Sequence, residues 1–369
     1  MRVAFLGAFD PDYPRTRVLR EGLAAHGVDV RLLPISSRPM LREAALVSSW
    51  AFRSGGVDAY LVPSFGHRDV PLAALLARIA AVPLLFDPLV SRWDTQVRDL
   101  GRVAPGSFSA ARVRASDAVA MRLAGIVLCD TWEHGELFAH EFGVPRSKLA
   151  RVPVGADRAA FAIGAERAGR ARHSSGEPLR VAYVGGFLPL HGVPVVIEAA
   201  AILEARHGPD FARFTLVGDG MTAHRADRDI AALGLRSVQR EGRVPYVRAL
   251  TALAEADVAL GIFGTTEKAA RVVPHKVYQA LALGVPTVTR RSPAVSELLP
   301  AGAGGEPLAL VPPGNAEALA TEIEGLARDP ARRDRLGAVG REAAVTFATP
   351  EKVGVSLLEA IERAKAVKR

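Results

Sequence analysis

The chain has 369 residues, 49% of them apolar, which is more core material than one domain usually buries, so two domains are expected. Lysine and arginine exceed aspartate and glutamate by 47 to 39, and the excess is spread over both halves without a polybasic tail. Such an even excess indicates affinity for anionic ligands and argues against a dedicated nucleic-acid surface.

The single cysteine, Cys129, excludes an internal disulfide framework and is typical of a reducing compartment. It ends an apolar run, which predicts a buried structural thiol more readily than a nucleophile. The N-terminal residues enter a strand pattern at once, without the basic start and long apolar stretch of a signal peptide. No run reaches the ~18 apolar residues of a membrane-spanning helix. The prediction is a cytoplasmic protein.

Short apolar runs alternate with amphipathic segments along the first half of the chain. This rhythm is typical of a parallel sheet that helices cover on both faces. The expected strands are 2–7, 28–33, 59–62, 83–86 and 125–129, and the first expected helix is 15–26. A charged and unpatterned stretch over 164–176 then predicts an interdomain linker.

The same rhythm restarts after this stretch. The expected strands are 179–184, 214–217, 237–239, 258–262, 285–289 and 308–311, with helices at 194–206 and 246–254 among them. An amphipathic helix over 350–368 is expected to pack back toward the first domain. The sequence therefore predicts a Rossmann-like acceptor domain over 1–165, a Rossmann-like donor domain over 178–346 and a C-terminal helix over 347–369. Ligands are expected between the domains, at strand carboxyl ends.

Two glycine-containing loops follow strands of the second half. Gly185-Gly186-Phe187 leads through His191 to a helix, and Gly218-Asp219-Gly220 follows the next strand. Glycine lets the backbone approach a ligand, and a helix N-terminus attracts an anion. Each loop is also compatible with an ordinary strand–helix turn, and Asp219 with a helix cap instead of a hydroxyl contact.

The segment from Arg271 to Gly284 is the most informative. Pro274 predicts the start of a helix and Gly284 its end. Arg271, His275 and Lys276 are then expected around one helix N-terminus, where three cations are unfavourable unless an anion joins them. A diphosphate meets that need, since Arg forks two oxygens and Lys acts as a point charge. The alternative is a solvated basic turn.

With these segments the sequence resembles the retaining family-four glycosyltransferases of the GT-B fold, the glycosyl transferases group 1. The resemblance covers nearly the whole chain and depends on the order and spacing of five segments. They are 153–157, 183–187 with 189–193, 217–220, 274–284 and 286–289. The resemblance implies two Rossmann-like α/β/α domains that face each other across a cleft, and a nucleoside-diphosphate sugar as donor substrate.

The resemblance places the donor in the second domain, with the first glycine loop at the diphosphate, the second beside the nucleoside and Val244 at the base. Together with the basic segment, the expected donor-binding residues are Gly185, Gly186, Phe187, His191, Gly218, Asp219, Gly220, Val244, His275 and Gln279. Family members typically retain the anomeric configuration and need no metal or other cofactor, because protein cations and a helix dipole neutralise the leaving diphosphate.

The chain departs from the family at two pairs of positions. Many relatives carry Arg and Lys where this chain has Gly186 and His191, and paired glutamates where it has Arg271 and Gln279. One interpretation is a loss of activity. The favoured one is compensation, in which Arg271 and Lys276 are the catalytic cations. Gln279 would then bond a sugar or ribose hydroxyl.

Loops of the first domain are expected to orient the acceptor. Asp87 follows a strand and is the candidate for a catalytic carboxylate at the acceptor hydroxyl, with a helix cap as the alternative for it and for Asp94. The loop 9–15 lacks the glycine pattern of a dinucleotide-binding turn, which argues against a dinucleotide cofactor. The expected acceptor-side residues are Asp10, Tyr13, Arg15, His67 and Asp94.

The stretch from Arg38 to Arg53 mixes apolar and basic residues. It is compatible with peripheral membrane contact that seats a lipid-linked acceptor, but a helix that covers the sheet is favoured. The acceptor is thus predicted only as a saccharide, a lipid-linked or another small molecule, and no metal or specific nucleic acid is expected. The alternative functions are a nucleotide-sugar epimerase or hydrolase on the same fold and a non-catalytic nucleotide-binding partner protein.

Overall fold

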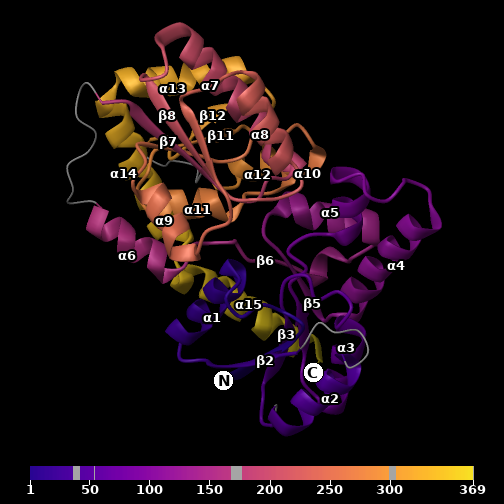
Figure 1. Ribbon diagram of the computed structural model, residues 1–369. Coiled ribbons are helices and arrows are strands. Elements are labelled where there is room, and N and C mark those ends of the chain that lie inside the picture. Colours follow the sequence, from indigo (N-terminus) through magenta and orange to yellow (C-terminus); the bar gives the residue numbers. More distant parts are fainter. Residues whose placement is uncertain (36–41, 54, 168–176, 299–304, 369) are drawn as a thin grey trace. The chain divides into compact units, whose positions relative to one another are not determined.

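The computed structural model describes residues 1–35, 42–53, 55–167, 177–298 and 305–368. The chain forms two compact units (Figure 1). Unit 1 comprises Met1–Asp157 and Thr349–Arg369, and unit 2 comprises Arg158–Ala348.

Unit 1 is built on a six-stranded parallel sheet with the strand order β2-β1-β3-β4-β5-β6. Its strands are β1 (Arg2–Gly7), β2 (Asp29–Pro34), β3 (Ala59–Val62), β4 (Leu84–Phe86), β5 (Ile126–Cys129) and β6 (Leu149–Arg151). The first five were expected to within a residue at either end. The edge strand β6 was not, because three residues at the margin of a sheet carry little pattern of their own.

Helices cover both faces of this sheet. One face packs against α2 (Arg42–Arg53), α3 (Val70–Ile79), α4 (Phe108–Leu123) and α5 (Trp132–Phe142). The other packs against α1 (Pro14–Ala25) and α15 (Pro350–Lys368). In α2, Leu46 is buried in the core and Trp50 packs against it, so this part of the basic stretch forms the covering helix that was favoured. Arg38, with the rest of 36–41, lies outside the described residues.

Helices α1 and α15 approach each other closely at a pair of glycines. A Cβ on Gly22 would lie 2.5 Å from the carbonyl oxygen of Pro350 and 2.9 Å from Cα of Gly354. Both obstacles are backbone atoms, which cannot move aside as a flexible side chain can. The C-terminal segment is therefore held against α1 by a contact that only glycine permits.

Gly22→Ala is expected to destabilise unit 1 by about 1–3 kcal/mol, because the added methyl forces the two helices apart. Gly55→Ala is the matched control, since a Cβ at Gly55 meets nothing within 4 Å. All three tryptophans, Trp50, Trp93 and Trp132, lie in unit 1, so urea unfolding followed by tryptophan fluorescence reports on this unit. Equal stability of the two variants would contradict the close-contact argument.

Unit 2 has its own six-stranded parallel sheet, in the order β12-β11-β10-β7-β8-β9. Its strands are β7 (Leu179–Val184), β8 (Ala212–Val217), β9 (Val238–Glu241), β10 (Val258–Leu260), β11 (Thr287–Arg290) and β12 (Ala309–Val311). Counted within the unit, this is the 3-2-1-4-5-6 order of the Rossmann fold. The expected α/β class with two Rossmann-like units is confirmed.

The helices of unit 2 form a layer on each side of its sheet (Figure 1). The first layer contains α7 (Val193–His207), α8 (Ala223–Ala232) and α13 (Ala316–Arg328), which share one core cluster with the sheet. The second contains α6 (Arg158–Arg167), α9 (Tyr246–Ala254) and α11 (His275–Ala282), which pack against one another. Helix α14 (Pro330–Phe347) contacts both α11 and α13.

The expected linker over 164–176 is wrong at its beginning, because residues 164–167 form the last turn of α6. Gly164 packs so closely on α11 that a Cβ there would lie 2.3 Å from the carbonyl oxygen of Ala282. Arg167 donates hydrogen bonds of 2.6 and 2.8 Å to the carbonyls of Ala254 and Ala256. Unit 2 therefore begins at Arg158, earlier than expected. Residues 168–176 lie outside the described part of the chain.

Candidate functional site

The strand order of unit 2 reverses between β7 and β10, and in such sheets ligands bind beyond the carboxyl ends of the strands at that point. The loop 185–192 follows β7 and contacts the loops on both sides. Phe187 donates a backbone hydrogen bond of 3.0 Å to the carbonyl of Asp219, after β8. On the other side, Phe263, after β10, donates one of 3.0 Å to the carbonyl of His191.

The second glycine loop is explained first by packing. A Cβ on Gly218 would lie 2.0 Å from the carbonyl oxygen of Gly185, and one on Gly220 would lie 2.7 Å from that of Phe187. Glycine is therefore required to seat this loop against the first one, whether or not a ligand binds there. Asp219 does not cap α8 within the described chain, since its carboxylate accepts from the adjacent backbone N–H of Gly220 at 2.8 Å.

Lys276 is the most unusual charged residue at the carboxyl ends of the unit 2 strands. Its side chain is only 5% exposed, and Nζ lies 3.6 Å from the centre of the Tyr183 ring. A Cβ on Gly185 would lie 2.7 Å from the same Nζ, so the glycine leaves room for the amine at the end of β7. Among the described residues, no hydrogen-bond acceptor reaches Nζ. Burial lowers the pKa of Lys276 well below its ordinary value.

His191 and Tyr183 form a bonded pair beside this amine. The Tyr183 hydroxyl donates to the carbonyl of Gly186 at 2.6 Å and lies 3.0 Å from Nδ1 of His191. Nδ1 also contacts the carbonyl of Gly186. Burial, and then the charge of Lys276, lower the pKa of His191 well below its ordinary value, so the imidazole is neutral near pH 7.

Helix α11 begins at His275 after Pro274, and Gly284 follows its end at a φ of 66°, as the sequence predicted. His275 is its half-buried first residue. Gln279 is buried one turn on and donates to the hydroxyl of Tyr246 at 3.0 Å. Val244 is half-buried in the loop that precedes α9.

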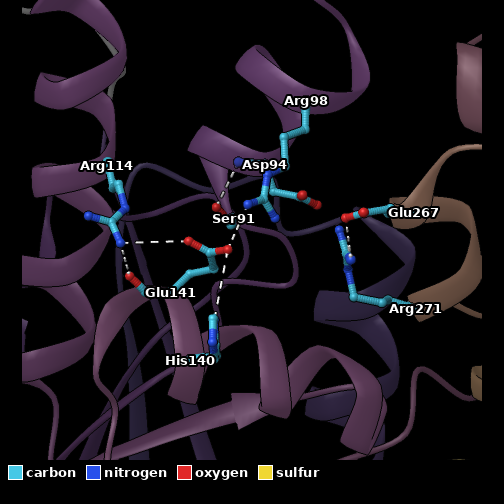
Figure 2. A network of polar contacts seen from close by, with 8 residues as sticks. All are labelled: Ser91, Asp94, Arg98, Arg114, His140, Glu141, Glu267 and Arg271. Atoms are coloured by element: carbon cyan, nitrogen blue, oxygen red, sulfur yellow. Dashed lines mark hydrogen bonds and ion pairs between the residues drawn. The ribbon is translucent and has the colours of Figure 1, made fainter. Parts of the chain in front are cut away.

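Arg271 does not belong to α11 but ends the short helix α10 (Glu267–Arg271). Its guanidinium lies 3.2 Å from the carboxylate of Glu267, one turn back on the same helix (Figure 2). The guanidinium is thus already neutralised in part. Two of the three expected cations therefore differ: Lys276 has no acceptor among the described residues, whereas Arg271 has a carboxylate partner.

The sequence analysis did not identify two further cations at the carboxyl edge of the unit 2 sheet. Lys268 is buried in α10, and its charge contributes to the lowered pKa of His191. Arg290 is the buried last residue of β11 and donates to the carbonyl of Gly264, and burial lowers the pKa of its guanidinium. Its position at the end of an apolar strand could have indicated it, because the carboxyl ends of parallel strands lie at the same edge of the sheet. Lys268 carried no such signal.

Unit 1 has a pocket at the corresponding place, where the strand order reverses between β1 and β3. Its volume is about 320 Å³, and it is lined by Ala8, Phe9, Asp10, Tyr13, Thr16, Ile35, Ser64 and Phe65. The rings of Tyr13 and Phe65 meet edge to face at 5.5 Å. Burial and the Asp87 carboxylate raise the pKa of Tyr13 to about 12. The expected acceptor-side residues Asp10 and Tyr13 thus line one pocket.

Asp87 and Arg15 form a buried ion pair next to these residues. Arg15 Nε lies 3.0 Å from Asp87 Oδ2, and neither side chain is more than 1% exposed. Arg15 also donates to the carbonyl of Pro153, and Ser64 donates to Asp87 at 3.4 Å. The structure therefore joins three of the expected residues, Asp87, Arg15 and Tyr13, into one cluster.

His67 and Asp94 were expected on the acceptor side, but both side chains are buried in unit 1. His67 is 1% exposed, its ring meets Phe86 edge to face at 5.0 Å, and Nε2 lies 3.8 Å from Asp117. Burial, and then Arg92, lower the pKa of His67 to about 3. Asp94 is fully buried and starts the π-helix η2 (Asp94–Asp99), with its backbone N–H on Ser91 Oγ at 3.0 Å (Figure 2). Neither lines the described pocket.

A surface network of unit 1 holds η2 to α5. Arg98 lies 2.6 Å from the carboxylate of Glu141, and Arg114 donates to the Glu141 carbonyl at 2.7 Å (Figure 2). The guanidinium of Arg98 also lies 4.4 Å from the centre of the Trp93 ring. These charges are satisfied by one another, so the network is structural.

None of the helices in the described ranges is long and apolar enough to cross a membrane.

Comparisons of sequence and structure agree with this geometry. Residues 178–329, less than half of the chain, match the family of glycosyl transferases group 1. A protein of Salmonella typhimurium (strain LT2) named as a colanic acid biosynthesis glycosyltransferase, WcaL, is 30% identical over 189 residues, which are 50% of this chain and 44% of that protein. The match thus spans less than half of that relative's length.

Two solved structures share the architecture over essentially the whole chain. Anabaena Alr3699/HepE, crystallised in complex with UDP, has a TM-score of 0.67 at 18% identity, over 98% of this chain and 100% of that one. Sucrose-phosphate synthase from Thermosynechococcus elongatus has a TM-score of 0.70 at 17% identity, over 100% of both chains. The chain therefore has the GT-B fold, and its second unit is similar in sequence to the glycosyl transferases group 1.

Proposed function

We propose that the protein is a glycosyltransferase that moves a sugar from a nucleoside-diphosphate donor to a hydroxyl acceptor. The observation that carries the proposal is Lys276, a buried amine without an acceptor among the described residues, at the switch point of a Rossmann sheet. Burying an unpaired charge is costly, and an anionic ligand offsets that cost. Lys276 lies within the segment 178–329, which matches the glycosyl transferases group 1.

Unit 2 is then the donor domain and unit 1 the acceptor domain. Structures of HepE contain UDP or UDP-glucose, which supports a nucleotide sugar as the donor. Lys276 and Arg271 would stabilise the charge that grows on the departing diphosphate, so the proposal includes no metal. The pocket lined by Asp10 and Tyr13 would hold the acceptor near the Asp87–Arg15 pair. The proposal also includes retention of the anomeric configuration and a cytoplasmic location. Retention is proposed from the family resemblance, and the location from the sequence.

The direct test is thermal unfolding of the purified protein with UDP, GDP, ADP and dTDP, and with the corresponding nucleotide sugars. A ligand that binds only the native state raises the melting temperature by linkage. A shift with one diphosphate would support the donor site and identify the base. The absence of any shift would favour the non-catalytic alternative, to which Arg271 and Gln279 at the positions of the paired glutamates also point.

Arg271→Ala is expected to weaken binding of that diphosphate by about 1.5–3 kcal/mol, the range for a hydrogen bond to a charged group. Part of the loss is offset because Arg271 already has Glu267 as a partner. Arg328→Ala is the matched control, since Arg328 also pairs with a glutamate one turn back, Glu324, in α13. Calorimetric titration with the diphosphate measures both variants. Equal affinities would remove Arg271 from the donor site.

A further inference from the structure

The surroundings of the Lys276 amine indicate how its protonation is controlled. The amine lies over the Tyr183 ring at 3.6 Å and against Gly185, whose missing side chain leaves the space that Nζ occupies. A ring face attracts a cation through its quadrupole, most strongly where water is excluded. Tyr183 is therefore the contact that favours the protonated amine, while burial disfavours it.

The titratable groups around the amine come from four elements. Tyr183 belongs to β7, His191 to the short 3-10 helix η4 (Pro189–His191), and His275 precedes Lys276 on α11. Lys268 of α10 acts on His191 as a second positive charge. The Tyr183 hydroxyl stays protonated, since burial raises its pKa well above 10. His191 competes with Lys276 for a proton, because the charge of Lys276 lowers the pKa of the imidazole.

We propose that Tyr183 is a positioning residue that holds Lys276 at the end of β7, and that the Lys276 amine takes up one proton from solvent when the donor's diphosphate binds. This inference rests on the proposed function. The proton adds to the nitrogen lone pair, and no bond to the ligand forms or breaks. The reason is electrostatic: burial favours the neutral amine in the free protein, and an adjacent anion favours the ammonium.

The sign of the pH dependence follows from these two states. Below the lowered pKa of the free protein the amine is already charged, so binding takes up no proton and affinity is flat with pH. Between that pKa and the higher pKa of the complex, binding takes up one proton. The association constant then falls by up to tenfold for each unit of rising pH. The free amine is thus a pH-dependent determinant of donor affinity.

Titration calorimetry with UDP as the probe, or with whichever diphosphate the thermal panel selects, measures this uptake. The apparent enthalpy is recorded in buffers of different ionisation enthalpy from about pH 6 to about pH 9, a range that brackets documented buried lysines and the ordinary neutral range. At each pH, the slope of the apparent binding enthalpy against the ionisation enthalpy of the buffer gives the number of protons taken up. We expect a value that rises toward one with pH in the natural protein and stays near zero in Lys276→Met.

Tyr183 is tested by separating its ring from its hydroxyl. Tyr183→Leu removes the ring, so the ammonium loses its support, and we expect UDP affinity to fall about tenfold or more with the uptake shifted to lower pH. Tyr183→Phe keeps the ring and should bind within about threefold of the natural protein. Tyr278→Phe, the same change at a buried tyrosine of α11, controls for loss of a buried hydroxyl. Melting temperatures without ligand show whether each variant is folded.

Each outcome bears on a different statement. Binding without proton uptake, or uptake that persists in Lys276→Met and is lost in His191→Gln, would overturn the assignment to Lys276. Equal affinity and pH profile in Tyr183→Leu and Tyr183→Phe would overturn the positioning role. If no nucleoside diphosphate binds the natural protein, the proposed function fails, and this inference fails with it.

Discussion

Lys276→Met is expected to stabilise the unliganded protein by about 1–3 kcal/mol, the scale of a buried polar group that lacks a partner. Methionine has nearly the shape of the lysine stem and fills the space beside Gly185 without a charge. The same change is expected to weaken diphosphate binding by about 2–5 kcal/mol, as when one partner of a buried charge pair is removed. Opposite signs for stability and binding are the mark of a functional group that the fold does not need.

Differential scanning calorimetry is the appropriate measurement, because the tryptophans all lie in unit 1 and do not report on Lys276. Lys352→Met removes the same charge at an exposed position of α15 and should change neither stability nor binding by more than about 0.5 kcal/mol. The two measurements on Lys276→Met are independent. A less stable variant would mean that the amine has an internal partner, and unchanged binding would exclude it from the donor site.

Asp87→Ala and Arg15→Met are each expected to destabilise unit 1 by about 3–5 kcal/mol, because each leaves an uncompensated charge in a buried site. The ion pair is at most 1% exposed at either side chain, so solvent does not screen it. The double variant Arg15→Met with Asp87→Leu should recover much of the loss, since an apolar pair of similar volume often replaces a buried ion pair at little cost. Urea unfolding followed by tryptophan fluorescence measures all three.

The double variant also separates two roles of Asp87. If the carboxylate serves only to neutralise Arg15, the folded double variant keeps transfer activity, whereas an acceptor-side role predicts its loss. Glu136→Ala is the control for the ion pair itself, because the Glu136–Arg146 pair of unit 1 is exposed and should contribute less than about 1 kcal/mol. Additive losses in the double variant would show that Arg15 and Asp87 are not coupled.

Local pattern determined much of the secondary structure. The strands 59–62 and 179–184 and the helices 246–254 and 350–368 have the bounds that the sequence predicted. In these segments apolar periodicity and the bounding glycines and prolines lie within a few residues of one another, so each element can be recognised without its neighbours. Helix α11, between Pro274 and Gly284, is the same case. The fold class followed from the order of these elements.

Tertiary packing decided the rest. The last turn of α6 has no helical pattern, but Arg167 holds it to three carbonyls of unit 2. The sequence indicated cations near a helix N-terminus, yet it did not distinguish Lys276, buried over Tyr183, from Arg271, paired with Glu267. Nor did it predict that Arg15 and Asp87 form a buried pair. Burial and partnership depend on which distant segments the sheet brings together, and no local spacing contains that information.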